Sequence, residues 1–382
     1  MNRRPRFTWS AVVMSAALLV SAACAPAAAP AGGGGAPAGG APATGTLTVG
    51  FLFVGPKDDF GYNQAAYLGS VEMEKKLGSK VKVLRAENVP ETEEAERVME
   101  GMIQQGAKVI FPTSYGHLDP ALNVAKRHAD VTFIHQGGLK TSTNLGTYFG
   151  NIYEGVYLGG VAAGKMTKTN KLGYIVSFPI PQVLENINAF ELGAKSVNPA
   201  ATTTVVFTAN WCDPGKQAEA ANNLIAQGVD VLTQHQDCGK TIVETAERKG
   251  VMSVGYHADA SSLAPKGWLT GAAWNWGPLY TQEVQAVLDG KWAGSPLAGK
   301  YRVGMKEGAV NMAAFGAGVP KDVQDLVKSK QQAILDGKLA PFAGPVKDQS
   351  GKERIATGVS PTVDVLETTD YLVEGVVGTI PK

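Results

Sequence analysis

Aromatic, amide and acidic side chains recur directly after the apolar, strand-like runs of this sequence, and their types suit the binding of a flat ligand. The groups are 59–64 (Asp-Phe-Gly-Tyr-Asn-Gln), 114–115 (Ser-Tyr), 210–211 (Asn-Trp), 234–235 (Gln-His) and 256–257 (Tyr-His). Planar side chains stack on a base with ~1–3 kcal/mol each. Amides and carboxylates match a polar ring edge, as Asn or Gln pairs with N6 and N7 of adenine. Any one of these aromatics is as well explained as core under a loop, but the repetition favours a cleft.

The same search gives little support to catalysis or to a metal site. None of the five histidines shows an HxxxH or HExxH spacing. There is no GxSxG nucleophile motif, and Ser114 before Tyr115 is more typical of a turn. A water-activating carboxylate cluster would have to come from scattered aspartates. We therefore predict no enzyme, no cofactor and no metal. The histidines are His117, His128, His135, His235 and His257, and the aspartates are Asp58, Asp59, Asp213, Asp237 and Asp259.

One segment partly matches the sequence motif of a phosphate-binding loop. Residues 159–165 run from a glycine through four residues to Gly164 and Lys165. Met166 stands where a Ser or Thr should bind Mg²⁺, and the preceding segment is helical in pattern rather than a strand. We interpret this segment as helix packing.

The elements that position these residues alternate between short β-branched strands and helices. Such alternation predicts an α/β fold with parallel sheets and right-handed crossovers. The pattern runs once to about residue 150 and then restarts, which predicts two similar lobes. The expected strands are 47–54, 81–89, 108–113, 131–135, 172–178, 203–209, 229–234, 251–256 and 268–274. The expected helices include 64–77, 91–105, 153–165, 183–197, 216–227 and 279–288.

The N-terminus carries a secretion signal that ends at Cys24. Three arginines within residues 1–6 precede an apolar run over 7–23, and small residues stand just before the cysteine. Residues 25–45 are almost wholly Ala, Pro and Gly, which predicts a flexible tether. We predict residues 1–24 as a lipoprotein signal peptide with Cys24 as the lipidated residue. Soluble secretion remains the alternative, because Ser21 replaces the usual leucine. A membrane-spanning helix is less favoured, because the run is short and lacks a positive flank.

Length, charge and cysteines narrow the class of protein. Residues 46–382 exceed the ~250–300 residues at which single cores divide, which again predicts two lobes. The formal charge of +1 falls to about −2 without the three N-terminal arginines, so nucleic acid is not an expected partner. Beyond Cys24 there are only Cys212 and Cys238. They could pair in an oxidising compartment, or both could stay free.

Several longer stretches resemble a known family. They are GFLFVGPKDDFGYNQ (50–64), FPTSYGHLDP (111–120), NLGTYFGNIYEGVYLGGVAAGKMT (144–167), FPIPQVLENINAFELGAKSVNP (178–199) and WNWGP (274–278). From residue 46 to about 344 the chain resembles the basic membrane protein family of substrate-binding lipoproteins, the purine-nucleoside receptors of ABC importers.

The resemblance implies a type I periplasmic-binding-protein fold, with two Rossmann-like lobes joined by a hinge and a purine clamped between them. The expected first lobe is 46–150 plus about 272–308, and the second is 151–271 plus about 309–350. Residues 351–382 would form a C-terminal extension.

The resemblance also assigns ligand contacts. The aromatics that enclose the base match Phe60 or Tyr62 on one side and Trp211 on the other. Asn63 matches the asparagine of the family's first motif, and Asp119 matches an acidic residue that reads the base edge. The full predicted set is Asp59, Phe60, Tyr62, Asn63, Ser114, Tyr115, Asp119, Trp211, Gln234, Asp237, His257, Asp259 and Trp274.

The ribose end departs from the family pattern. The family's ribose-binding aspartate falls at or near His257, with Asp259 two residues on, and its lysine falls at about Trp274. An imidazole and an indole offer less to sugar hydroxyls than an anion–cation pair does. We therefore expect a free purine base, adenine-like, to be preferred over a nucleoside.

The resemblance implies delivery of that purine to an ABC permease by a monomer anchored on the extracytoplasmic face of the cell membrane. A sensor of the same fold that signals to a membrane partner is the first alternative. An extracytoplasmic purine nucleoside enzyme is a weaker one.

Overall fold

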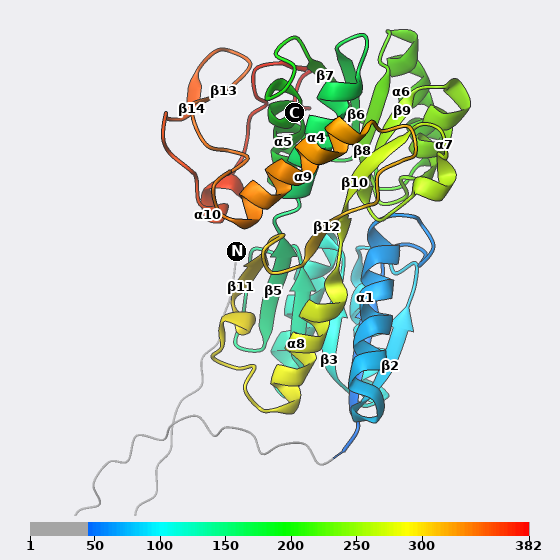
Figure 1. Ribbon diagram of the computed structural model, residues 1–382. Helices are drawn as coiled ribbons and strands as arrows, with labels where there is room; N and C mark the ends of the chain where they lie inside the picture. Colours follow the sequence, from blue (N-terminus) through cyan, green and yellow to red (C-terminus); the bar gives the residue numbers. More distant parts are fainter. Residues whose placement is uncertain (1–44, 382) are drawn as a thin grey trace, which may run out of the picture. The chain divides into compact units, whose positions relative to one another are not determined.

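The computed structural model describes residues 45–381, and they form two parallel β-sheets flanked by helices (Figure 1). Cys24, the predicted signal peptide and the predicted tether up to residue 44 lie outside the described residues. The prediction of an α/β fold with two parallel-sheet lobes is confirmed. We call the sheets, with the helices that cover them, lobe A and lobe B.

Lobe A is built on a six-stranded parallel sheet in the order β11-β5-β4-β3-β1-β2. Successive side chains of a strand point to opposite faces, so Phe51 packs in the core under α1 and α8 whereas Leu52 packs under α2 and α3. The strands are β1 (Leu47–Leu52), β2 (Val81–Ala86), β3 (Ala107–Pro112), β4 (Thr132–Gln136), β5 (Leu145–Gly150) and β11 (Lys300–Val303). The helices are α1 (Tyr62–Leu77), α2 (Glu93–Gln104), α3 (Leu118–Arg127) and α8 (Trp276–Leu288).

Lobe B repeats this plan with a seven-stranded sheet in the order β12-β10-β9-β8-β6-β7-β15. All its pairings are parallel except that of β12 with β10. The strands are β6 (Lys171–Val176), β7 (Thr202–Phe207), β8 (Val231–His235), β9 (Met252–His257), β10 (Trp268–Trp274), β12 (Val310–Met312) and β15 (Val376–Val377). The helices are α4 (Tyr153–Met166), α5 (Pro181–Lys195), α6 (Pro214–Ala226), α7 (Lys240–Lys249) and α9 (Lys321–Leu335).

The glycines of the loop-like segment 159–165 lie inside α4, as interpreted. A Cβ on Gly160 would stand 2.1 Å from the backbone oxygen of Phe190, and one on Gly193 would stand 2.0 Å from that of Tyr157. These glycines therefore let α4 and α5 pack backbone against backbone.

The chain passes between the lobes in three places: from β5 to α4, from β10 to α8, and from β11 to β12. The second passage lies after Trp274, because β10 stays in the sheet of lobe B to that residue. The sequence predicts this boundary between the lobes slightly earlier, at about residue 272.

The predicted C-terminal extension, 351–382, is part of both lobes. β15 adds to the edge of the lobe B sheet beside β7, and Asn188 of α5 bonds the backbone of Tyr371 and Val373. The short helix α10 (Val363–Leu366) instead meets β11 of lobe A, where Lys300 pairs with Asp364 at 2.6 Å. A two-stranded hairpin, β13 (Val346–Lys347) with β14 (Glu353–Ile355), precedes it.

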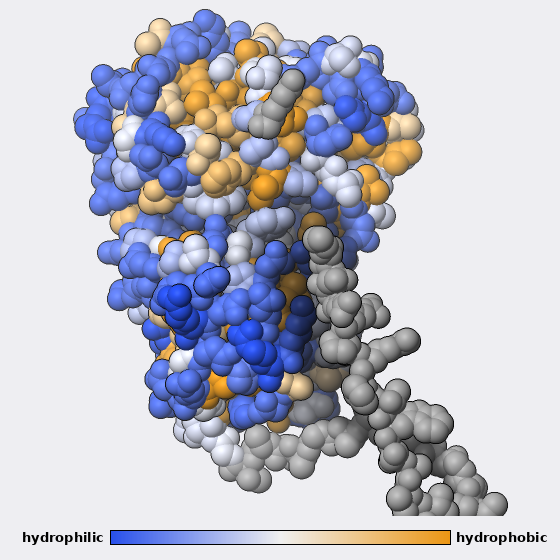
Figure 2. All heavy atoms as spheres, turned by 180° about the vertical axis from the view of Figure 1, so that it is seen from behind, coloured by the Kyte–Doolittle hydropathy of each residue, from blue (hydrophilic) through white to orange (hydrophobic). Residues whose placement is uncertain are grey.

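The surface seen from behind Figure 1 is mainly hydrophilic over lobe A (Figure 2). Charged residues of α2 and α3 account for part of this surface, since Arg127 pairs with Glu96 and Glu100. Among residues 45–381 no helix has the length and apolar character needed to cross a membrane.

Candidate ligand-binding site

A pocket of about 320 Å³ lies between the two lobes, at the carboxyl ends of the strands. Open parallel sheets bind ligands at this edge because the loops that follow the strands converge there. Its lining comes from both lobes: Tyr62, Ser114 and Tyr115 from lobe A, and Ile180, Gln182, Trp211, His235 and Asp237 from lobe B. The strand-end pattern of the sequence points to this same edge of both sheets.

The aromatic lining consists of Tyr62 from lobe A and Trp211 from lobe B, with Tyr115 beside them. Phe60, the alternative to Tyr62, does not line the pocket. It has a left-handed φ of 52°, and its ring packs against the apolar cluster around Val243 and Trp268. Lys240 lies 5.7 Å from the same ring. Phe60 is therefore a contact between the lobes, and Tyr62 is the aromatic of this loop that lines the pocket.

The loop before α1 is organised by the buried carboxyl group of Asp59. Its two oxygens accept hydrogen bonds from the backbone N–H groups of Gly61, Asn63 and Gln64 at 2.8, 3.0 and 2.9 Å. They also accept one from the Asn63 amide at 2.8 Å. Burial raises the pKa of Asp59, and these hydrogen bonds oppose the rise. Asp59 therefore fixes the loop that presents Tyr62 and has no acceptor capacity directed at the pocket.

Asp237 lies opposite this loop and is 7% exposed. Its backbone oxygen accepts from the N–H of Tyr62 at 3.2 Å, and a Cβ on Gly61 would stand 1.7 Å from that oxygen. Only glycine permits the lobes to approach so closely. The Asp237 carboxyl group accepts no hydrogen bond from any residue in 45–381. Burial, and then the charges of Asp59 and Glu91, hold its pKa well above the usual range.

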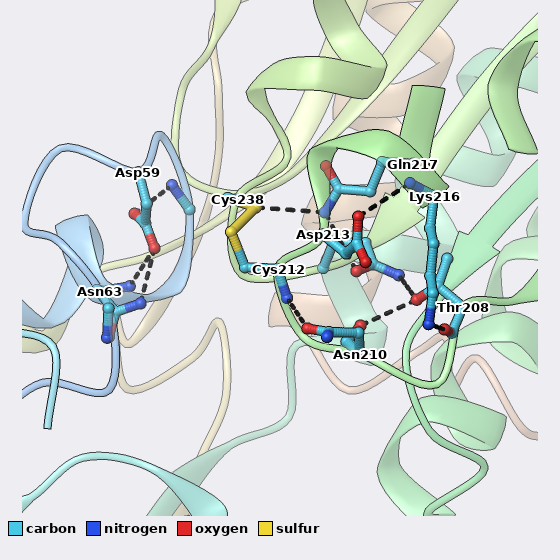
Figure 3. Close-up of a disulfide and its surroundings, with 12 residues drawn as sticks. Asp59, Asn63, Thr208, Asn210, Cys212, Asp213, Lys216, Gln217 and Cys238 are labelled. Carbon is cyan, nitrogen blue, oxygen red and sulfur yellow. Dashed lines mark hydrogen bonds between the residues drawn. A yellow bond between two sulfur atoms is a disulfide. The ribbon is translucent and has the colours of Figure 1, made fainter. Parts of the chain in front are cut away.

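A disulfide joins Cys212 to Cys238, with 5.3 Å between the two Cα atoms (Figure 3). It links the loop that carries Trp211 to the loop that carries Asp237, and the Asp237 N–H also donates to the Trp211 carbonyl at 2.8 Å. Gln217 supports it by donating to Cys238 Sγ at 3.3 Å. The disulfide thus holds two of the lining side chains of lobe B in one unit.

The predicted ribose end is filled by aromatic side chains. The indole N–H of Trp274 donates to Nδ1 of His257 at 2.8 Å, and the Tyr62 ring meets the His257 ring edge to face at 5.2 Å. Burial and then the neighbouring His235 hold the pKa of His257 well below its usual value, so the imidazole is neutral. Neither His257 nor Trp274 lines the pocket of 320 Å³. They form a wall behind Tyr62.

Four further predicted contacts lie away from the pocket. The Asn63 side-chain amide donates to the Asp59 carboxylate and accepts from the N–H of Gly55. The Gln234 side chain accepts from the N–H of Gln236 at 2.5 Å. Asp119 and Asp259 are on the surface. Asp119 is 74% exposed and pairs with Lys140 at 3.0 Å, because α3 buries Leu118, Ala121 and Val124 and turns Asp119 outward. Asp259 accepts from the N–H of Ser261 in a turn.

Three lining residues were absent from the predicted set of ligand contacts: Ile180, Gln182 and His235. Ile180 lies in the loop between β6 and α5, and Gln182 lies in the first turn of α5, where the sequence lacks an aromatic–amide pair. Burial lowers the pKa of His235 to about 3, and His235 contacts Asn186 at 3.2 Å through Nδ1.

Because the sequence leaves an enzyme as an alternative, the surroundings of Ser114 and of the acidic residues of the site bear on catalysis. Ser114 Oγ donates to Glu91 at 2.5 Å and has no histidine within hydrogen-bonding distance among the described residues. No cluster of His, Cys, Asp or Glu in residues 45–381 could hold a metal ion. The geometry is that of an enclosed binding site with stacking surfaces and one unsatisfied carboxyl group.

Comparisons with known proteins agree with this picture. The family model described as "ABC transporter substrate-binding protein PnrA-like" matches residues 46–350. A purine-binding protein of Brucella abortus is 40% identical over 87% of this chain and 93% of its own. A protein of Haloferax volcanii, named as a candidate ABC transporter glucose-binding protein, is 36% identical over 76% of this chain and 70% of its own. A solute-binding protein of an ABC transporter system from Conexibacter woesei superposes with a TM-score of 0.64 at 21% identity, over 77% of this chain and 98% of that one.

Proposed function

The chain belongs to the Bmp family of PnrA-like ABC transporter substrate-binding proteins, and on that premise we propose that it binds a purine base of the adenine type. The family binds and carries a solute rather than transforming it. In our proposal the base lies between Tyr62 and Trp211, and closure of the lobes presents it to a permease. A purine nucleoside is the alternative ligand.

The observation that carries this proposal is the Asp237 carboxyl group, which is buried in the pocket without a hydrogen-bond partner among the described residues. A buried polar group without a partner costs ~1–3 kcal/mol, so a ligand that pairs with it gains that amount. The raised pKa favours the neutral acid, which offers one donor and one acceptor side by side. Adenine presents the complementary pair, the N6 amino group beside the N7 acceptor.

The preference for a base over a nucleoside follows from His257 and Trp274. Their mutual hydrogen bond uses the indole donor and one imidazole nitrogen. A sugar at that end would have to displace two packed rings. The name of the Brucella abortus relative supports a purine, whereas that of the Haloferax volcanii relative makes glucose the ligand to test against it.

Isothermal titration calorimetry with adenine, adenosine and glucose tests the proposal. We expect adenine to bind most tightly, adenosine more weakly, and glucose not at all. Tighter binding of adenosine would overturn the preference for a base. Binding of glucose without binding of either purine would overturn the purine assignment itself.

We also propose that a lipid on Cys24 holds the monomeric protein on the extracytoplasmic face of the cell membrane beside its permease. The arginine-containing segment and the apolar run before Cys24 support this location. Membrane fractionation of Cys24→Ala tests it. We expect the variant to leave the membrane fraction, and a variant that stays there would rule out lipid as the anchor.

A further inference from the structure

A second compartment of about 500 Å³ adjoins the pocket that contains Asp237. The two share Tyr115, Ile180 and Gln182 in their linings, so these three residues lie at the border between them. A purine in the first compartment would leave the second one unfilled.

Two polar groups of this second compartment come from one face of α5, and Tyr115, Asn151, Arg302 and Glu367 also line it. Gln182 and Glu185 are three residues apart and therefore lie on the same side of the helix. Glu185 is 7% exposed, and its carboxyl group forms no hydrogen bond with any described residue. The amide nitrogen of Gln182 is buried and also has no partner within residues 45–381. The buried amide nitrogen of Gln182 and the Glu185 carboxyl group thus both border this space without a partner among the described residues.

The remaining charges of the compartment are already paired. Arg302 of β11 donates to the carboxylate of Glu367 and to the carbonyl of Gly138 at 2.8 Å. Burial and the nearby Glu367 raise the pKa of Glu185 to about 8, against the opposing effect of Arg302. Glu185 is therefore suited to a neutral hydrogen-bonding partner rather than to a cation, and Arg302 is not available to an anion.

Apolar side chains form much of the remaining wall, and one of them comes from the C-terminal segment. Leu139 and Phe149 of lobe A face the space, and Val363 of α10 closes it. α10 reaches this position because Lys300 and Arg302 hold Asp364 and Glu367 against β11.

We propose that the second compartment binds a substituent of the purine: a short apolar arm that ends in a hydroxyl group. The arm would pack on Leu139, Phe149 and Val363, and its hydroxyl would pair with Glu185. This inference rests on the proposed purine function, and it names the ligand class more closely as an alkyl-substituted adenine.

Calorimetry of the full-length protein tests it with adenine, N6-butyladenine, N6-(4-hydroxybutyl)adenine and the two N9-substituted isomers. We expect the butyl arm, attached at either N6 or N9, to tighten binding about tenfold over adenine, because the arm buries apolar surface. The hydroxyl group should tighten it further. If adenine binds and no arm improves its affinity, the inference fails while the proposed function stands. If adenine does not bind, both fail.

Three variants locate the arm. Val363→Trp should remove the gain from the arm and leave adenine affinity unchanged, because it fills only the second compartment. Val365→Trp is the matched control, since Val365 lies on the same helix and is exposed to solvent. Glu185→Leu should abolish the additional effect of the hydroxyl and keep that of the butyl group. Equal weakening of adenine and its extended forms by Val363→Trp would contradict the assignment.

Discussion

Asp59 and Asp237 are both buried aspartates at the closure of the two lobes, yet their surroundings differ completely. Asp59 on lobe A accepts four hydrogen bonds, three of them from the backbone of its own loop. Asp237 on lobe B accepts none at its side chain from any described residue, although its backbone is fully engaged with Tyr62 and Trp211. The first aspartate completes a loop, and the second is left for a ligand.

The difference shows that burial alone does not identify a binding residue. Burial is the largest cause of the raised pKa at both positions, so the direction of that shift does not distinguish them. What distinguishes them is the number of donors within reach, because a buried acceptor without donors keeps its full desolvation cost until a ligand arrives. The four predictions that follow test this distinction, beginning with the largest expected effect.

Substitution of Asp237 should separate hydrogen bonding from charge. Asp237→Ala leaves the polar edge of the base unpaired in a buried site, so we expect adenine affinity to fall about 100-fold. Asp237→Asn keeps one donor beside one acceptor, as the neutral acid does, and should stay within about threefold of the wild type. Calorimetry measures both. A loss at Asn as large as that at Ala would show that the ligand needs the charged carboxylate.

The same substitution at Asp59 should act on stability. An asparagine amide nitrogen donates but does not accept, so Asp59→Asn loses the bonds made to one oxygen. We expect the free energy of unfolding, measured by urea denaturation, to fall by about 2 kcal/mol. Asp58→Asn is the control, because the adjacent Asp58 is exposed and should change stability by less than about 0.5 kcal/mol. Equal stability of Asp59→Asn and Asp58→Asn would contradict the structural role assigned to Asp59.

The sequence predicted the layout of the fold because the alternation of apolar strands and amphipathic helices is a local signal. It missed the addition of β15 to the lobe B sheet, since two residues, Val376 and Val377, carry no periodicity. It also placed the second passage between the lobes slightly early, because the boundary depends on which sheet Trp274 joins.

The strand-end rule predicted Tyr62, Ser114, Tyr115, Trp211 and His235, all of which line the pocket, and Asp237 of the predicted contact set lines it as well. It could not separate them from Asp59, Asn63 or Gln234, which follow strands in the same way but bond to neighbouring protein groups. Whether an amide or a carboxylate is already satisfied depends on distances that only the folded chain sets. Sequence patterns therefore locate the binding edge, and hydrogen-bond geometry selects the residues.

The pH dependence of binding provides a third, smaller test. If the neutral form of Asp237 donates to the base, affinity is highest at low pH and falls as pH rises through the raised pKa of that group. Measured by calorimetry between about pH 6 and about pH 8.5, binding should weaken as the pH rises, in the direction set by the raised pKa. His235 stays neutral over this range because its pKa is about 3. Asp237→Asn should give a flat profile, and the same slope in that variant would assign the titration to Asp59 or Glu185, whose pKa values burial also raises.

The smallest expected effect is at Asp119, which the family resemblance assigned to the base edge. Its carboxylate is 74% exposed and pairs with Lys140 on the outer side of α3, so Asp119→Asn should change adenine affinity by less than about twofold. Tyr62→Leu, measured beside it, should cost about tenfold through lost stacking. A large loss at Asp119 together with a small loss at Asp237 would reverse the comparison. It would mean that lobe A, rather than lobe B, reads the base, and that α3 turns inward when the ligand binds.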